Sequence, residues 1–250
     1  MNILIVNDDG IDSEGIEILV RALTPYGKIY VSAPLEQQSA KSHAISISNK
    51  IEIVPVDLIP GTMATVAVVG SPADATRVGL KIFNTEFDLV VSGINNGPNI
   101  ARDVLYSGTV AAAMEARNQG VNAIAFSADT LELEYLYDEV IKTIDDILES
   151  KSHEFEEGIL NVNFPKQTHA KPKGVKYTIL GNRHFHSEFI KDTKDNNIYY
   201  IKSSINQFQE HPDSDVKAYE DGFISITPLS LDRTCYNIFN KLKIPTNNSN

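Results

Sequence analysis

The sequence predicts an α/β fold, in which a doubly wound, mostly parallel sheet is followed by a C-terminal β-hairpin arm and a C-terminal helix. Two observations lead to this prediction. Short apolar runs rich in β-branched residues alternate with amphipathic helical patterns over about the first 165 residues. The last third contains short β-type runs and a single helical pattern instead. We therefore expect a core in residues 1–175, and an arm, a returning strand and a helix in residues 176–250, within one structural domain.

The opening of the chain sets this pattern. Apolar residues at 3–6 fit a strand that is buried on both faces of a parallel sheet. The polar segment NDDG at residues 7–10 ends this strand, and an amphipathic helical pattern follows at residues 13–23. A second strand is expected at residues 28–34, so the first 34 residues are predicted to form a strand–helix–strand unit.

Strand and helix patterns then alternate through the core. Ser71-Pro72-Ala73-Asp74 has the residues of a capping box with proline at the first helical position, which predicts a helix to about residue 83 that buries Ile82. The residues from 45 to 56 fit a strand or one arm of a hairpin. The other elements expected in the core are strands at 87–92, 121–127 and 158–164, and helices at 107–118 and around 136–147.

The C-terminal segment is expected to be an arm. The elements expected there are short strands at 176–180, 188–191, 198–202 and 223–227, and a helix at 235–242. Residues 195–197 have the composition of a hairpin tip. A two-stranded arm that carries apolar residues such as Tyr199 and Tyr200 is marginal alone, so we expect it to pack on another subunit.

Composition and charge exclude several classes of protein. The 250 residues carry a formal net charge of −11, which argues against a general nucleic-acid or anionic-membrane binder. The single cysteine, Cys235, excludes an internal disulfide, and its apolar neighbours predict that it is buried. No apolar run approaches the length of a membrane span, and no signal-peptide pattern is visible, so we expect a cytoplasmic protein.

Two adjacent carboxylates follow the first strand. In an open α/β sheet, ligands bind beyond the carboxyl ends of the strands, so Asp8 and Asp9 lie where chemistry is usually done. Adjacent carboxylates repel each other, and a divalent cation with oxygen ligands removes that repulsion. The alternative is that both residues belong to a turn or cap a helix. These ten residues alone leave both interpretations open.

Two further polar loops could complete a metal site. Asn95 lies in the loop SGINNGPN, which follows the strand expected at 87–92, and it offers a neutral oxygen at the same sheet edge. Ser39, in the loop after the second strand, adds a hydroxyl. This oxygen-only set suits Mg²⁺, Mn²⁺ or Ca²⁺ better than Zn²⁺. Taken singly, Asn95, Asn96 and Asn99 fit turn chemistry and Ser39 fits a solvated loop, so only the combination indicates a metal.

The segment Ser107-Gly108-Thr109 opens an alanine-rich helix. Exposed amides at a helix N-terminus can bind an anion without Lys or Arg, which is how an acidic protein could hold a phosphate. The alternative is a plain N-cap at Ser107, which stabilises a helix by about 1 kcal/mol. Beside an acidic pair and an Asn-rich loop at the same sheet edge, the segment supports a combined phosphate and metal site.

Other motifs carry less weight. His184 and His186 would lie on one face of a strand with no third ligand near in sequence, which favours a solvated pair. The dinucleotide fingerprint, the P-loop, the nucleophile elbow and the HExxH zinc motif are absent from the sequence. A phosphoaspartate enzyme of the haloacid type would need Asp-x-Asp after its first strand, whereas the two aspartates here are adjacent.

Four segments together resemble one known family. MNILIVNDDG, VVSGINNGPN, DVLYSGTVAAAMEA and SDVKAYEDGFISITPL are similar to the SurE family of stationary-phase survival proteins, over nearly the whole chain. The resemblance implies a metal-dependent nucleotidase that removes phosphate from nucleoside 5′- and 3′-monophosphates. It also implies a Rossmann-like core and a C-terminal arm that is exchanged between subunits in dimers and often in tetramers.

The resemblance also implies roles for individual residues. Asp8, Asp9, Ser39 and Asn95 would bind one divalent cation per subunit, Mg²⁺, Mn²⁺ or a similar ion. Asn96 and the turn Ser107-Gly108-Thr109 would lie at the phosphate, and Asp8, Asp9 and Asn96 would be the catalytic residues. Two segments depart from the family pattern: Gln38-Ser39-Ala40 replaces a common Arg-Ser-Gly, and Ala101-Arg102 stands where a pair containing glycine is common.

The hypothesis from the sequence is therefore a metal-dependent phosphomonoesterase of nucleotidase type, with a nucleoside monophosphate as its partner. The first alternative is a non-catalytic nucleotide-binding regulator that uses the same sheet edge. A metal-dependent hydrolase of a substrate without phosphate is a further alternative.

Overall fold

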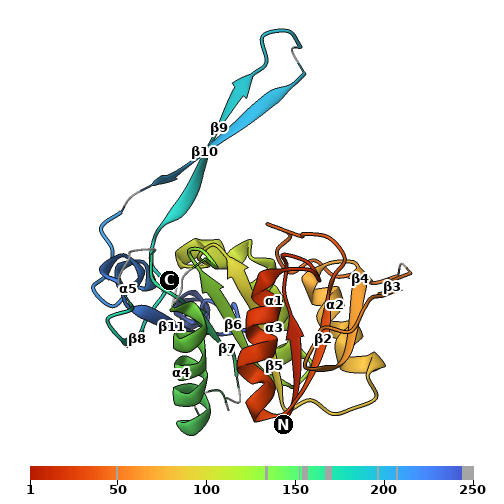
Figure 1. Ribbon diagram of the computed structural model, residues 1–250. Helices are drawn as coiled ribbons and strands as arrows, with labels where there is room; N and C mark the ends of the chain where they lie inside the picture. The colour runs from red at the N-terminus through yellow and green to blue at the C-terminus, as the bar shows by residue number, and fades with distance from the viewer. Residues whose placement is uncertain are drawn as a thin grey trace.

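The structure is a computed structural model that describes residues 1–48, 50–132, 135–151, 153, 157–166, 171–195, 197–206 and 208–243. These residues form a nine-stranded sheet with helices on both faces and a two-stranded arm that projects well beyond the sheet (Figure 1). The predicted α/β class, with a mostly parallel sheet and a C-terminal hairpin, is confirmed. The exchange of the arm between subunits stays a prediction.

The order of the strands places a ligand site at the centre of the sheet. The order is β3 (Glu52–Pro55), β4 (Thr62–Val69), β2 (Lys28–Pro34), β1 (Asn2–Val6), β5 (Leu89–Asn96), β6 (Asn122–Ala128), β7 (Ile159–Asn163), β11 (Ile224–Leu229) and β8 (Val175–Tyr177). From β4 to β7 all neighbours are parallel, whereas β3 and β11 run antiparallel to β4 and β7. The chain winds outward in one direction through β2 and in the other through β5, so β1 and β5 flank the topological switch point.

Two layers of helices bury the two faces of the sheet. Helices α1 (Glu14–Leu23) and α4 (Leu136–Glu149) contribute to one hydrophobic core, and α2 (Pro72–Ile82) and α3 (Gly108–Asn118) contribute to the other. In α4, the apolar stripe of the sequence is buried as expected, because its members recur at helical spacing on the face toward the sheet. The doubly wound arrangement is thus confirmed.

Helix α2 begins as predicted but ends differently. Ser71 and Asp74 form both hydrogen bonds of a capping box. The expected burial of Ile82 is wrong, since its side chain is 40% exposed. Phe83, one residue later, packs on the ring of Tyr30 with 5.3 Å between ring centroids, and so it takes the apolar contact at this end of the helix.

Strand β4, helix α5 (Asp215–Asp221) and strand β3 differ from the elements expected from the sequence. Strand β4 and helix α5 were not expected, and the predicted strand at 45–56 is confined to β3. Short 3₁₀ helices occur at η1 (Thr24–Tyr26) and η2 (Ala101–Leu105). Strands β8 and β11, which belong to the predicted C-terminal segment 176–250 almost entirely, join the main sheet. The division of the chain into residues 1–175 and 176–250 stays a prediction.

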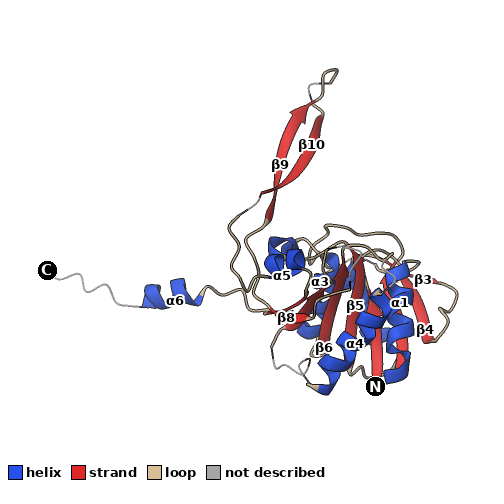
Figure 2. Ribbon diagram, turned by 60° about the vertical axis from the view of Figure 1, so that its left-hand side comes forward, coloured by secondary structure: helices blue, strands red, loops and turns tan. Residues whose placement is uncertain are grey.

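The two strands of the arm and helix α6 (Tyr236–Lys243) are largely exposed. Strands β9 (His184–Lys191) and β10 (Tyr199–Asn206) form an antiparallel arm whose last pair is Lys191 with Tyr199, as expected for a tip near residues 195–197. Asn196 itself lies outside the described residues. Helix α6 extends away from the sheet (Figure 2) and has no buried residue. The predicted burial of Cys235 is therefore wrong, and its side chain is exposed.

Within the described residues, no helix combines the length and apolar character needed to cross a membrane.

Candidate active site

A cavity of about 200 Å³ lies beyond the carboxyl ends of β1 and β5. Its lining residues are Asp8, Asp9, Gln37, Ser39, Ala40, Asn95, Asn96, Pro98, Asn99, Asp103, Tyr106, Ser107 and Phe185. The structure thus brings together the acidic pair, the serine after β2, both asparagines of β5 and the first residue of the SGT turn. Gly108 and Thr109 do not line the cavity, and Thr109 is fully buried.

The loop after β1 is fixed by Asn7, which is fully buried. The Asn7 Nδ2 donates to the carbonyl oxygen of Gly10 at 2.9 Å and to Oγ of Ser13 at 2.6 Å, and Asn7 Oδ1 accepts from the Gly10 N–H at 3.2 Å. Gly10 has φ of +104°, a backbone conformation that glycine adopts without strain. The two aspartates between these residues are therefore held in one orientation.

An irregularity in β5 determines where its asparagines lie. The pairing of β5 with β6 shifts register between Ser92 and Asn95, and Gly93 within the shift has φ of +132°. A Cβ atom at Gly93 would lie 2.3 Å from the carbonyl oxygen of Phe126, so only glycine fits there. The Asn95 Nδ2 donates to the carbonyl oxygen of Gly97 at 2.6 Å, which leaves Oδ1 as the atom of Asn95 that a cation could use.

The loop that carries Ser39 is tied to both sides of the cavity. The Gln38 N–H donates to the carbonyl oxygen of Asp8 at 2.7 Å. Four residues on, the Ser42 N–H donates to the carbonyl oxygen of Tyr106 at 3.0 Å, and Ser42 Oγ donates to that of Leu105 at 2.7 Å. These bonds lay the polar loop across the sheet edge, which explains why a serine far from Asp8 in sequence lines the same cavity.

The N-terminus of α3 holds Asp8. Ser107 Oγ accepts from the Val110 N–H at 3.1 Å and so caps the helix. Thr109 Oγ1 donates to Asp8 Oδ1, and the Gly108 N–H also hydrogen-bonds the Asp8 carboxylate. The first turn of the helix therefore binds a carboxylate of the protein itself. A phosphate contact of Gly108 or Thr109 stays a prediction, whereas their contact with Asp8 is present in the structure.

The acidic pair has an unusual electrostatic environment. Burial raises the pKa of Asp8 from 3.8 to about 6, and the nearby charge of Asp9 adds to that rise, while the hydrogen bond from Thr109 opposes it. Asp9 accepts from Gln37 Nε2 at 3.1 Å and from the Asn96 N–H at 3.2 Å. Across the described residues, neither aspartate forms an ion pair with Lys or Arg, so the pair lacks a cationic partner there.

Asp103 is a third carboxylate at the cavity, and it has its own cation. Arg183 Nη2 lies 2.8 Å from Asp103 Oδ2. Burial nevertheless raises the pKa of Asp103, although Arg183 opposes the rise.

At the start of η2, Ala101 has φ of +51°, which favours glycine, and its N–H donates at 2.8 Å to Oδ2 of the buried Asp215. A glycine would adopt this backbone conformation without strain, which explains why a pair containing glycine is common in place of Ala101-Arg102.

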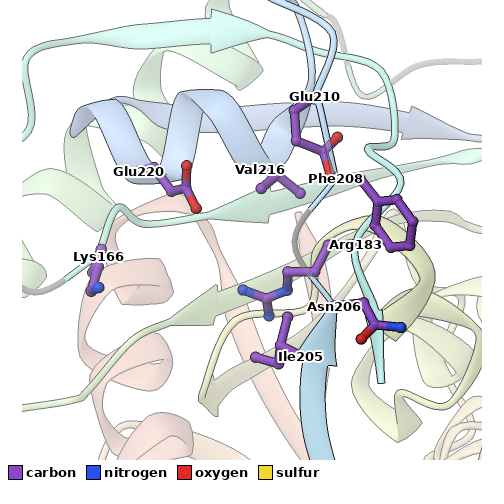
Figure 3. A pocket seen from close by; sticks show the side chains of 8 residues that line it. All are labelled: Lys166, Arg183, Ile205, Asn206, Phe208, Glu210, Val216 and Glu220. Atoms are coloured by element: carbon purple, nitrogen blue, oxygen red, sulfur yellow. The ribbon is translucent and has the colours of Figure 1, made fainter. Parts of the chain in front are cut away.

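Arg183 also reaches a second cavity, of about 330 Å³, at the base of the arm (Figure 3). This cavity is lined by Lys166, Arg183, Ile205, Asn206, Phe208, Glu210, Val216 and Glu220. Basic and acidic side chains are balanced in it. It is separate from the acidic cavity, and the two share no lining residue.

His184 and His186 do not line the acidic cavity. His184 stacks on Phe208, with 4.9 Å between ring centroids, and His186 is exposed. In the part of the chain that the structure describes, no three or more His, Cys, Asp or Glu side chains form a group that could hold a metal. A cation at Asp8 and Asp9 would thus depend on hydroxyl and amide oxygens as well.

Seven residues that line the cavity were not assigned to the site from the sequence: Gln37, Ala40, Pro98, Asn99, Asp103, Tyr106 and Phe185. Gln37 lies two residues before Ser39, and Asp103 and Tyr106 lie within four residues before Ser107. Their nearness in sequence to predicted site residues is the signal that could have identified them. Phe185 belongs to the arm, and no local pattern connects it to residues 8 and 9.

The fold and the cavity define a doubly wound α/β protein with an acidic, oxygen-rich ligand site at its topological switch point. The family model described as survival protein SurE matches residues 3–187, and the chain belongs to this family.

Relatives match along almost the full length. A 5′-nucleotidase SurE of Alkaliphilus metalliredigens is 37% identical over 249 residues, which cover 97% of this chain and 98% of that protein. A 5′/3′-nucleotidase SurE of Salmonella arizonae is 36% identical over 241 residues, covering 94% and 92%. The crystal structure of the SurE protein from Aquifex aeolicus has a TM-score of 0.81 at 32% identity, covering 97% and 98%.

Proposed function

We propose that this protein is a metal-dependent phosphomonoesterase that hydrolyses nucleoside 5′- and 3′-monophosphates to nucleoside and phosphate. Membership of the SurE family and relatives named 5′-nucleotidase and 5′/3′-nucleotidase support this proposal. The observation that carries it is the shared cavity of Asp8, Asp9, Ser39 and Asn95 at the sheet edge.

The side chains of the cavity fit a divalent cation. Asp8 is only 4% exposed and burial raises its pKa, so a cation beside it would stabilise its charged form. Ser39 and Asn95 supply neutral oxygens, and an oxygen-only set suits Mg²⁺ or Mn²⁺. When bound, such a cation supplies Lewis-acid chemistry, because it withdraws charge from a phosphoryl oxygen and makes water more acidic.

The residues of the chain would orient the reactants. Thr109 and Gly108 hold the Asp8 carboxylate in place, and Gln37 and the Asn96 N–H hold that of Asp9. The Asn96 side chain lines the cavity and would donate to a phosphoryl oxygen. The partial positive charge of the α3 N-terminus favours an anion nearby.

Hydrolysis needs one water molecule. Its oxygen attacks phosphorus in line, the bond between phosphorus and the sugar oxygen breaks, and that oxygen takes up a proton. Asp8 or Asp9 is the group of the cavity that would accept the proton of the attacking water.

Release of phosphate from nucleoside monophosphates tests the proposal. Protein treated with EDTA should be inactive, and Mg²⁺ or Mn²⁺ should restore phosphate release. Asp8→Asn should lose activity with metal present, whereas Asp12→Asn, which removes an exposed carboxylate four residues away, should retain it. Full activity of Asp8→Asn, or no release with any nucleotide and cation, would contradict the proposal. Binding of nucleotides without release would favour the alternative of a regulatory nucleotide-binding protein.

A further inference from the structure

Two half-exposed aromatic rings stand at the rim of the acidic cavity. Among its lining residues, the aromatic ones are Tyr106, 53% exposed, and Phe185, 49% exposed. They come from distant parts of the chain: Tyr106 directly precedes the cap of α3, and Phe185 is the second residue of β9. Because both rings are half exposed at the rim of the same polar cavity, their faces are available to a ligand bound there.

The size of the cavity says which part of a substrate these rings would meet. At about 200 Å³ it is smaller than the roughly 300–1,000 Å³ of pockets that enclose a drug-sized ligand. Its polar groups, Asp8, Asp9, Ser39, Asn95 and Asn96, suit the phosphate end. The remainder of a nucleoside monophosphate would extend beyond the cavity, past its rim.

We propose that Tyr106 and Phe185 bind the nucleobase of the substrate by stacking, an inference that rests on the proposed nucleotidase function. Flat aromatic faces bind a base through its π-face, which every base possesses. The two rings therefore contribute affinity for nucleotides in general and little discrimination among bases. Phosphate monoesters without a base gain nothing from them.

The base of the arm holds Phe185 next to the cavity. Arg183, two residues before Phe185, pairs with Asp103, and the Arg183 carbonyl oxygen accepts from the Arg102 N–H at 3.3 Å. His184, which lies between Arg183 and Phe185, stacks on Phe208. These contacts anchor the start of β9 to η2, so the arm contributes a substrate-binding side chain to the site as well as an extended surface.

Two substrates that differ only in the base provide the test. Adenosine 5′-monophosphate and ribose 5-phosphate share the sugar and the phosphate, and only the first has a base. Phe185→Ala and Tyr106→Leu should each raise KM for adenosine 5′-monophosphate about fivefold or more, with kcat nearly unchanged, because stacking contributes to binding before and during the reaction. The kinetics with ribose 5-phosphate, or its inhibition constant where turnover is too slow, should stay the same.

Matched variants separate stacking from damage to the arm. Phe185→Tyr and Tyr106→Phe keep a ring, so the rise in KM should be much smaller than in Phe185→Ala and Tyr106→Leu. Phe189→Ala removes a 67% exposed phenylalanine from the same strand, away from the cavity, and should leave KM unchanged.

Three outcomes would overturn the inference: equal losses with both substrates, an unchanged KM in Phe185→Ala and Tyr106→Leu, or the same loss in Phe189→Ala. A wild-type protein that releases phosphate from no nucleoside monophosphate would instead overturn the proposed function. The two failures are thus distinguishable.

Discussion

Replacing Gly108 by alanine tests whether the start of α3 positions the acidic pair. A Cβ atom at Gly108 would lie 2.7 Å from Cβ of Asp8, 2.8 Å from Cγ of Pro72 and 2.9 Å from Oδ2 of Asp8. Pro72 begins α2 and is held by the capping box, so it cannot easily withdraw. The strain should therefore displace Asp8.

The size of the effect follows from these distances. Ordinary contacts of a Cβ atom begin at 3.4 Å, so Asp8 or the helix must shift by about 0.7 Å. A misplacement of about 1 Å in a catalytic group can cost on the order of 100-fold in rate. Overpacking of this kind typically costs about 1–3 kcal/mol of stability. We expect Gly108→Ala to fold, to melt at a lower temperature and to lose most of its nucleotidase activity.

Gly120→Ala, just beyond the other end of α3, is the matched control. A Cβ atom there meets nothing within 4 Å, but φ of +89° makes alanine strained by about 1–2 kcal/mol. Both variants should thus lose comparable stability in a thermal melt, while only Gly108→Ala should lose phosphate release and affinity for Mn²⁺. If Gly108→Ala kept wild-type kcat and metal affinity, or Gly120→Ala lost as much activity, the first turn of α3 would not position Asp8.

Further predictions concern charge and capping. Folding raises the pKa of Asp8 from 3.8 to about 6, so in EDTA the ionisation of Asp8 lowers the free energy of unfolding as the pH rises from about 4 to about 6. Asp8→Asn removes this ionisation. The variant should therefore raise the free energy of unfolding in EDTA at pH 8 by up to about 3 kcal/mol, and by little at pH 4. The exposed Asp12→Asn should have no such effect, and urea unfolding at the two pH values measures both. Arg183→Ala leaves Asp103 buried without its cation and should cost about 3 kcal/mol, and adding Asp103→Asn should recover part of this loss in a double-mutant cycle. Ser71→Ala removes one half of the α2 capping box and should cost about 1 kcal/mol in a thermal melt with kcat unchanged, so that a large loss of activity would contradict a purely structural role.

Local patterns predicted most of the core well because their causes act over a few residues. The strand at 28–34 has the predicted bounds, and the capping box at Ser71 forms as expected. Burial of the α4 stripe follows from helical spacing alone. The failures occur where packing decides: Ile82 is exposed because Phe83 makes the apolar contact, and Cys235 is exposed because α6 extends away from the sheet.

The sequence by itself determined the α/β class and the polar loops at the strand ends, including the acidic pair, since the periodicity of apolar residues and the end of an apolar run are visible along the chain. Only the tertiary structure decided which atoms meet. Thr109 donates to Asp8 from 101 positions away, and Phe185 reaches the rim of the cavity from the arm. Such contacts depend on the order of the strands and on the paths of the loops between them, and no pattern within one segment encodes either.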